Sequence, residues 1–156
     1  MKELLEYRVF LVNRMEQATK EFCLACESLG ASTLVDEEWN VHQTAVHVRE
    51  LYQQVYRERM LRTLHEENPL FGDFDPDEWM ATHYKKEESL EIVLSEFGSS
   101  MDELCKVLRD VPVEAWSRVS HHEIIGEGLT LQLWAERGLA HIEEHLLALK
   151  AVNREV

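Results

Sequence analysis

Two histidines near the end of the chain, His141 and His145, have a spacing that suits metal chemistry on a helix. Residues four apart lie one above the other on the same helix face. Trp134 and Leu149 share that face, so we expect it to point into the protein. Two buried imidazoles repel each other when protonated, whereas a shared metal ion uses the lone pairs of both neutral rings. The pair predicts part of a metal site, with a solvated or hydrogen-bonded histidine pair as the alternative.

His47 is the strongest candidate for a third ligand, because it lies one turn before Leu51 and borders the apolar stripe of its predicted helix. Three neutral histidines from two helices leave coordination positions open, which is typical of catalytic rather than structural metal sites. Zn²⁺, Ni²⁺ and Fe²⁺ all accept imidazole ligands. A divalent ion held in this way can lower the pKa of a water molecule to about 7, or it can activate a thiolate.

Carboxylates close to these histidines in the sequence are candidates for proton transfer. Glu50 and Gln54 follow His47 on one face of its predicted helix, and Glu144 immediately precedes His145. Glu50 and Glu144 are therefore the predicted general bases, since a carboxylate within hydrogen-bond reach of a reacting group can accept its proton. The alternative for each is an ordinary solvated helix residue.

The other five histidines are predicted to lie outside the site. His42 stands at the start of the second helix and faces away from the third ligand. His65 and His83 stand near helix ends beside charged residues, which indicates a surface position. His121 and His122 are expected in a surface turn, with the rim of a pocket as the alternative.

The elements that must hold these side chains are predicted to be helices. Apolar residues recur at steps of three and four, and no segment shows the period of two that is typical of strands. Asn40 with Gln43, and Asp75 with Pro76, form patterns that start helices. The expected long helices span residues 2–29, 41–65, 85–109 and 131–152, and a short one spans 76–84. The sequence thus predicts one all-α domain, residues 1–156: a four-helix bundle with a short extra helix between its second and third long helices.

Charge and composition disfavour several classes of protein. The 156 residues include 16 Lys and Arg against 30 Asp and Glu, a formal net charge of -14, which disfavours nucleic-acid binding. No apolar stretch approaches the ~20 residues of a membrane span, and acidic residues stand too early for a signal peptide. We therefore expect a cytoplasmic protein without membrane contact. Cys23, Cys26 and Cys105 are expected to be reduced, with the C-x-x-C pair as small apolar helix residues rather than zinc ligands or a redox pair.

Short runs of residues along the chain form an ordered pattern. They are WNV at 39–41, His47 in the following helix, ENPLF at 67–71, DPDEW at 75–79, HEIIG at 122–126, LTL at 129–131 and HIEEHL at 141–146. In their order and spacing these runs resemble the DinB/YfiT-like superfamily of metal-binding four-helix proteins. The resemblance spans about residues 39–149, which is most of the chain.

This resemblance implies a four-helix bundle with an unusual connection order, often found as a homodimer. It also implies that His47, His141 and His145 are the metal ligands. Characterised relatives include S-transferases and isomerases that depend on the thiols bacillithiol or mycothiol, and others are described as metal-dependent hydrolases.

The sequence therefore favours a metal-dependent enzyme that acts on a small-molecule substrate at a three-histidine site. Thiol-dependent S-transfer and hydrolysis both fit, and only the first requires a low-molecular-weight thiol as a second cofactor. The alternative is a non-catalytic metal-binding or small-ligand-binding bundle with a role in a stress response. This alternative predicts a filled metal shell, so a fourth protein ligand beside the histidines would favour it.

Overall fold

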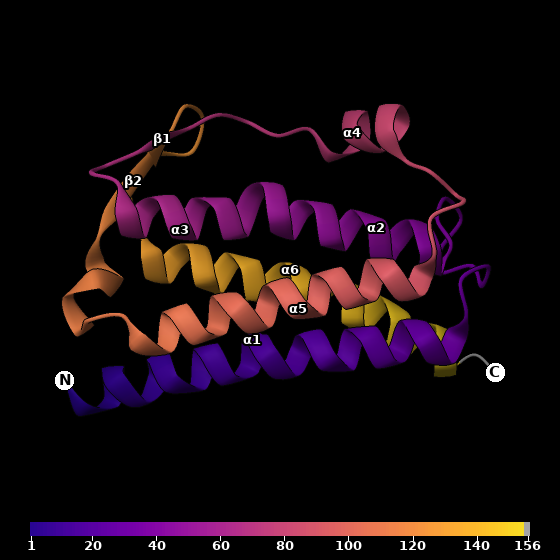
Figure 1. The fold of residues 1–156 in the computed structure, drawn as a ribbon, viewed down its shortest axis with the longest axis horizontal. Helices are drawn as coiled ribbons and strands as arrows, with labels where there is room; N and C mark the ends of the chain where they lie inside the picture. Colours follow the sequence, from indigo (N-terminus) through magenta and orange to yellow (C-terminus); the bar gives the residue numbers. More distant parts are fainter. Residues whose placement is uncertain (155–156) are drawn as a thin grey trace.

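Four long helical rods pack side by side and make up most of the molecule (Figure 1). The computed structural model describes residues 1–154. The rods are α1 (Lys2–Leu29); α2 (Val41–Leu51), which continues through a π-helical turn η1 (Tyr52–Arg57) into α3 (Glu58–His65); α5 (Leu90–Asp110); and α6 (Leu131–Arg154). Two short helices, α4 (Pro76–His83) and the 3-10 turn η2 (Val113–Ser117), lie in the connections. The predicted four-helix bundle with one short extra helix is confirmed.

The order of the rods explains the long connection in the middle of the chain. Helix α1 packs against α5 and α6, and α2 packs against the same two helices. Helices α1 and α6 run in one direction, while α2–α3 and α5 run in the other (Figure 1). Because α2 and α5 are neighbours that run the same way, the chain must return along the length of the bundle between them. Residues 66–89, which include α4, make this return.

The predicted capping residues form their hydrogen bonds. The side chain of Asn40 accepts the N–H of Gln43, and the side chain of Gln43 accepts the N–H of Asn40, which completes a capping box at α2. Asp75 accepts two backbone N–H groups at the start of α4, where Pro76 occupies the first turn. The capping box fixes where α2 begins, and with it the position of His47, six residues after Val41.

One predicted boundary is wrong. The third long helix begins at Leu90 rather than at residue 85. The preceding residues are held in a non-helical path because Glu88 is tied to the second rod: its backbone carbonyl accepts a hydrogen bond from His42, and its carboxylate pairs with Arg49. These contacts come from residues about 40 positions away, so the local helical pattern does not report them.

A π-helical turn interrupts the second rod without breaking it, and the sequence pattern did not predict it. Such turns insert an extra residue into a helix and are frequent at functional sites. Here the turn carries Tyr56, whose side chain packs against α6 at Gly138. A Cβ atom at Gly138 would approach the Cβ of Tyr56 to 3.3 Å, so the absence of a side chain lets the two helices lie close.

A small three-stranded sheet closes one end of the bundle, although the sequence indicated no strands. Its strands are β1 (Leu70–Phe71), β2 (Val119–His122) and β3 (Gly126–Thr130), in the order β1-β2-β3. Strand β1 is parallel to β2 and pairs Phe71 with His122, and β2 forms an antiparallel hairpin with β3. Strands this short, with an irregular register, cannot show a period of two. The sheet joins the long connection to the segment before α6.

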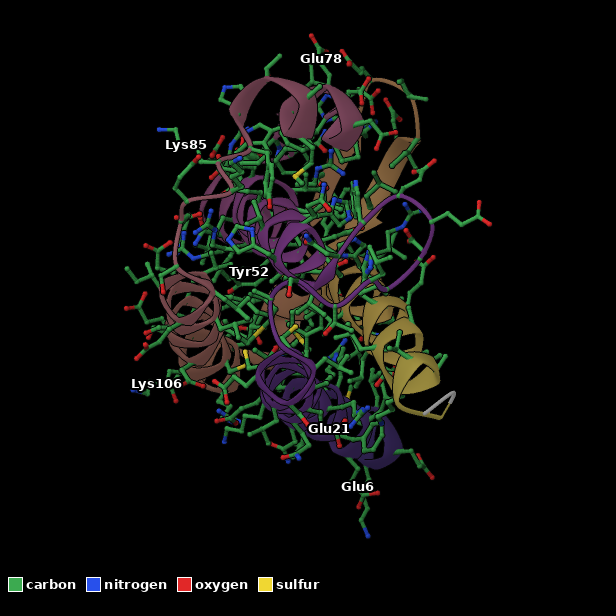
Figure 2. All side chains as sticks on the ribbon, turned by 90° about the vertical axis from the view of Figure 1, so that its right-hand side faces the viewer. Glu6, Glu21, Tyr52, Glu78, Lys85 and Lys106 are labelled. Atoms are coloured by element: carbon green, nitrogen blue, oxygen red, sulfur yellow. The ribbon has the colours of Figure 1, made fainter. Side chains whose placement is uncertain are left out.

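The core of the bundle is apolar, with a few buried polar groups that find partners. Viewed along the bundle, Tyr52 points inward while charged residues such as Glu21 and Lys106 lie at the periphery (Figure 2). The Tyr52 hydroxyl donates to the carbonyl of Ser100 over 2.9 Å. On α5, the apolar residues Leu94, Phe97, Met101, Leu104 and Leu108 all pack inside this core. None of the described helices is long and apolar enough to cross a membrane.

Candidate metal centre

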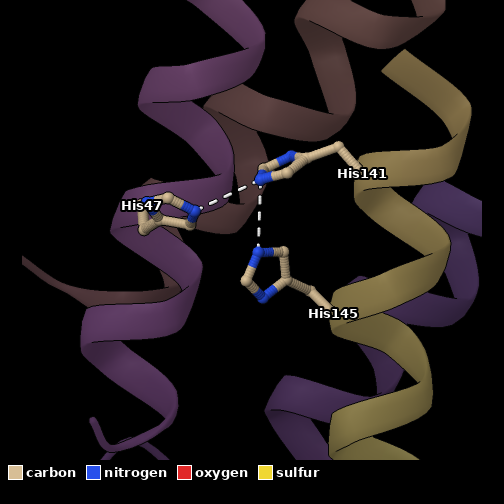
Figure 3. A group of neighbouring side chains, drawn as sticks. All are labelled: His47, His141 and His145. Atoms are coloured by element: carbon tan, nitrogen blue, oxygen red, sulfur yellow. Dashed lines mark hydrogen bonds between the residues drawn. The ribbon is translucent and has the colours of Figure 1, made fainter. Parts of the chain in front are cut away.

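His47 of α2 and His141 and His145 of α6 meet between the two rods (Figure 3). The Nε2 atom of His141 lies 3.2 Å from the Nε2 atom of His47 and 3.2 Å from that of His145. All three ligand atoms lie within 4.8 Å of one another. The structure thus brings together the three residues predicted as ligands, two from one helix turn and one from 94 positions away.

Burial keeps these histidines neutral. Together with a smaller contribution from the neighbouring histidines, it lowers the pKa of His47 to about 4 and that of His141 to about 3. Burial also lowers the pKa of His145, although the negative charges of Glu144 and Asp36 act in the opposite direction. At neutral pH each ring therefore has a lone pair available for a metal ion.

The arrangement of nitrogen atoms fits a divalent cation. His141 Nε2 stands in both 3.2 Å contacts, yet it has only one proton or one lone pair, so it cannot make two ordinary N–H···N bonds. Ligands about 2.05 Å from a tetrahedral ion lie about 3.3 Å apart, close to the observed separations. The described part of the chain also offers no partner to the buried Nδ1 atom of His141. Packing rather than a hydrogen bond orients this ring.

Aromatic side chains form the walls around the three histidines. The ring centres of Trp39 and His47 are 4.8 Å apart, and those of Tyr56 and His141 are 5.5 Å apart. Burial raises the pKa of Tyr56, so its hydroxyl keeps its proton at neutral pH. Among the described residues, no fourth histidine, cysteine or carboxylate joins the group. A cation bound there would keep coordination positions for other molecules.

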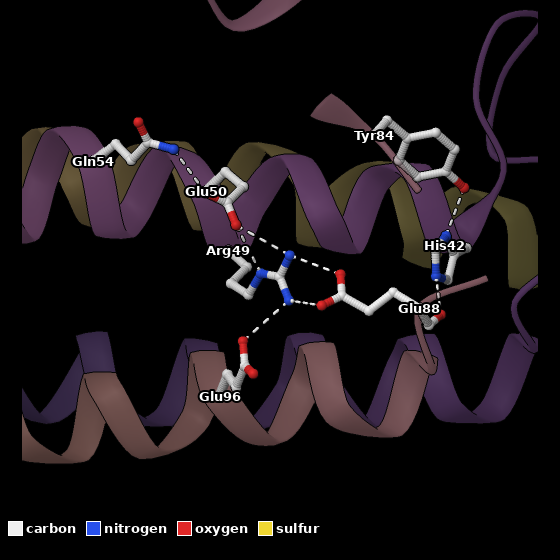
Figure 4. A network of polar contacts seen from close by, with 7 residues as sticks. All are labelled: His42, Arg49, Glu50, Gln54, Tyr84, Glu88 and Glu96. Atoms are coloured by element: carbon white, nitrogen blue, oxygen red, sulfur yellow. Dashed lines mark hydrogen bonds and ion pairs between the residues drawn. The ribbon is translucent and has the colours of Figure 1, made fainter. Parts of the chain in front are cut away.

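The two predicted bases lie in different surroundings. Glu144 is exposed on α6, and its negative charge acts on both His145 and Tyr56, which places it on the side of the histidines. Glu50 belongs to another group: its carboxylate pairs with Arg49 at 3.0 Å and accepts a hydrogen bond from Gln54 (Figure 4). The geometry therefore favours Glu144 over Glu50 as a proton acceptor at this centre.

The remaining histidines divide into surface and buried residues. His65 and His83 are exposed, as predicted. His42 is buried: the Tyr84 hydroxyl donates to its Nδ1, and its Nε2–H donates to the carbonyl of Glu88, each over 2.6 Å. The expected surface turn at His122 is wrong, because this residue ends strand β2 and is only 4% exposed. Its burial depends on pairing with β1 from the distant connection, which no local pattern reveals.

The cysteines are free and unsuited to catalysis. Cys26 and Cys105 are buried and Cys23 is partly buried, and no disulfide joins them. Burial raises the pKa of the Cys23 and Cys105 thiols to about 11 and also raises that of Cys26. The thiolate is the nucleophile and the metal ligand, so these groups are inert near neutral pH.

Comparison with known proteins agrees with this architecture. The structure matches that of YfiT from Bacillus subtilis with a TM-score of 0.86 and 19% sequence identity, over 96% of this chain and 87% of that one. YfiT is described as a probable metal-dependent hydrolase with an unusual four-helix bundle topology. No protein with curated annotation matches the sequence significantly. The family model of the DinB superfamily matches residues 11–149, and the chain therefore belongs to the DinB superfamily.

Proposed function

We propose that this protein is a metal-dependent hydrolase of a small molecule, with His47, His141 and His145 as the ligands of a divalent cation. The observation that carries the proposal is the convergence of three neutral imidazoles on one point without a fourth ligand among the described residues. The description of YfiT as a probable metal-dependent hydrolase supports the reaction class. Zn²⁺, Ni²⁺ and Fe²⁺ all suit the donor set.

The chain's own residues define the rest of the chemistry. A divalent cation at the three histidines supplies Lewis-acid polarisation and a water molecule of lowered pKa. Trp39 packs on His47 and Tyr56 on His141, so that each ring covers part of one histidine. The protonated Tyr56 hydroxyl can donate a hydrogen bond to an oxygen atom of the substrate. Glu144 is the proposed proton acceptor, because its carboxylate lies on this side of α6 and has no ion-pair partner within the described residues.

The first test is the metal content of tag-free protein, measured by elemental analysis. We expect about one Zn, Ni or Fe per chain in the wild type and almost none in His47→Ala and His145→Ala. His83→Ala is the matched control, since it removes an exposed histidine and should leave the metal content unchanged. Wild-type protein that stays free of metal after incubation with each ion would refute the proposal and favour a non-catalytic small-ligand-binding bundle.

The second test separates hydrolysis from thiol transfer. Loaded protein is assayed against a panel of ester, amide and lactone substrates, and in parallel for conjugation of electrophiles to low-molecular-weight thiols. We expect hydrolysis without added thiol, reduced in kcat by Glu144→Gln and unaffected by the matched Glu50→Gln. Turnover only when a thiol is present would replace the hydrolase with an S-transferase at the same centre. Loaded protein without either activity would favour a metal-binding module.

A further inference from the structure

A second polar group lies beside the metal centre, where Arg59 of α3 meets His122 at the end of β2. The backbone N–H groups of Ile124 and Ile125 point at His122 Nδ1 from 3.0 and 3.1 Å. A backbone N–H can only donate, so Nδ1 is an acceptor and carries no proton. The neutral ring therefore carries its proton on Nε2.

This tautomer leaves two donors facing each other. The Nε2–H of His122 lies 3.2 Å from Nη2 of Arg59, and a guanidinium has no acceptor. Neither group can accept a hydrogen bond from the other. Both side chains are also buried, since Arg59 is only 8% and His122 only 4% exposed. Buried donors without an acceptor are destabilising, and the pair of N–H groups marks a place for a missing acceptor.

Arg59 also lacks a carboxylate partner. Its Nη2 donates to the carbonyl of Gly72 over 3.1 Å, and its guanidinium lies 4.7 Å from the ring centre of Trp134. Among the described side chains no carboxylate lies within ion-pair distance of it, and the attraction of Asp73 acts from further away. A second cation, Arg137, lies on the same tryptophan at 5.9 Å and repels Arg59. Buried arginines are normally paired, and this chain, with a net charge of -14, has many carboxylates that could pair with Arg59. A buried guanidinium without such a partner is therefore unusual here.

A cavity of about 170 Å³ is lined by both Arg59 and His122. At about 30 Å³ for each water molecule, it has room for five or six non-hydrogen atoms. Its walls include the apolar side chains Val55 and Phe74, and Tyr56 forms the wall on the side of the metal centre. Because the Tyr56 ring is 5.5 Å from that of His141, the cavity and the histidines share one wall.

We propose that this cavity is the anchor for a carboxylate group of the substrate, which accepts hydrogen bonds from the Arg59 guanidinium and the His122 Nε2–H. Asp73 also borders the cavity, and its negative charge repels a doubly charged phosphate more strongly than a singly charged carboxylate. The apolar walls suit a short alkyl chain. The substrate class is then a small carboxylic acid whose reactive bond extends past Tyr56 towards His141. This role as a substrate anchor rests on the proposed function, whereas the binding of a carboxylate does not.

The test uses metal-free protein, so that failure of the metal centre cannot affect it. Propanoate is titrated while the backbone amide signals of Ile124 and Ile125 are followed by NMR. We expect saturable shifts with propanoate and none with the neutral, isosteric propanamide. Shifts with propanamide, or no shifts with propanoate, would overturn the proposal, and tighter binding of inorganic phosphate would overturn the assignment of a carboxylate.

Two variants locate the site. Arg59→Met should weaken propanoate binding about 10- to 100-fold, as expected for loss of a hydrogen bond to a charged group. His122→Asn keeps a side-chain acceptor for the two N–H groups and lacks the Nε2–H, so it should weaken binding about 10-fold even if Arg59→Met does not fold. The matched control is Arg8→Met, since Arg8 is equally buried, lies over Trp116 and bonds a carbonyl elsewhere in the bundle. Unchanged affinity in His122→Asn would overturn the proposal.

Discussion

Two residues on one helix, His47 and Arg49, are both buried and take part in opposite kinds of polar cluster. Arg49 is surrounded by three carboxylates: Glu88 at 2.8 Å, Glu50 at 3.0 Å and Glu96 at 3.1 Å (Figure 4). His47 instead lies beside two other neutral imidazoles (Figure 3). The donors and acceptors of these three rings cannot all pair with one another.

This difference distinguishes polar clusters that stabilise the fold from polar clusters that bind a ligand. In the Arg49 cluster the protein itself provides an opposite charge for the buried cation, and the contacts connect α2, α5 and the segment before α5. In the histidine cluster, three neutral imidazoles converge, and no fourth histidine, cysteine or carboxylate among the described residues joins them. A buried cluster whose groups satisfy one another stabilises the fold, and one whose groups remain unsatisfied indicates an external ligand. The variants described next either break this comparison or sharpen it.

The largest expected effect is loss of metal affinity in His141→Ala. His141 stands between the other two histidines, so its removal takes away one ligand and the link between both 3.2 Å contacts. Loss of a residue that hydrogen-bonds to a metal ligand typically lowers metal affinity about 10- to 100-fold. Loss of the ligand His141 itself should lower Zn²⁺ affinity by more than this. Competition with a chromophoric chelator measures this affinity. Without metal, the three histidines do not satisfy one another's hydrogen-bonding groups. His141→Ala should therefore leave the free energy of unfolding of metal-free protein almost unchanged, unlike substitution of other buried residues. A loss of several kcal/mol would contradict the comparison.

Arg49→Met should have the reverse effect. It leaves the carboxylates of Glu50, Glu88 and Glu96 close together without their cation, so the fold loses stability. Breaking a fully buried pair costs about 3–5 kcal/mol, but Glu96 is half exposed, so we expect about 2–3 kcal/mol from urea denaturation. Zn²⁺ affinity per folded molecule should stay within about 2-fold of the wild type. A large loss of metal affinity would show that the two clusters act as one.

The two clusters should respond to acid in different pH ranges. The folded-state pKa of His47 is about 4 against an ordinary 6.5, so between these values the unfolded chain binds a proton that the folded chain does not. Stability of metal-free protein should therefore fall as the pH drops from 6.5 towards 4, by up to about 2 kcal/mol for His47 at pH 5. His47→Ala should reduce this slope, as measured by urea denaturation at pH 7.5 and 5. An unchanged slope would contradict the neutral, buried state of the ring.

The carboxylate of Glu88 titrates in a lower range. Its hydrogen bonds to Arg49 hold its pKa below the ordinary 4.5, so its contribution to stability is complete above pH 4.5 and is lost as the pH falls through its folded-state value. The histidine cluster therefore loses stability first on acidification, and the charge cluster loses it afterwards.

The elements that carry these clusters differed in how far the sequence predicted them. The long helices follow from apolar steps of three and four, and His141 and His145 share a face because they stand on one such helix. His47 borders the stripe of another helix, which makes it the candidate third ligand, and the resemblance to a known family implies the same three residues. These features depend on a short range of sequence or on a recurring pattern.

Features that depend on distant contacts were missed. Two of the three carboxylates around Arg49, those of Glu88 and Glu96, come from segments 39 and 47 residues away, so nothing near Arg49 in the sequence reveals them. His122 is buried because β2 pairs with a two-residue strand about 50 positions earlier. The π-helical turn at Tyr52–Arg57 is a change in the backbone hydrogen-bond ladder, and its only trace in the sequence is the single five-residue step from Val55 to Met60. Each of these is set by tertiary structure rather than by local propensity.

Glu88→Gln gives the smallest effect and the finest test of the comparison. The amide keeps a hydrogen-bond acceptor for Arg49 and removes one charge, and the side chain is 31% exposed, so the loss resembles that of a surface ion pair. We expect about 0.5–1 kcal/mol in urea denaturation at pH 7, and this difference should shrink as the pH falls through the lowered pKa of the wild-type carboxylate. Glu96→Gln serves as a control, because Glu96 is more exposed and makes one contact with Arg49, so its substitution should have a smaller effect. Equal effects from both substitutions would show that total charge around Arg49, rather than the two-pronged bond to Glu88, stabilises this cluster.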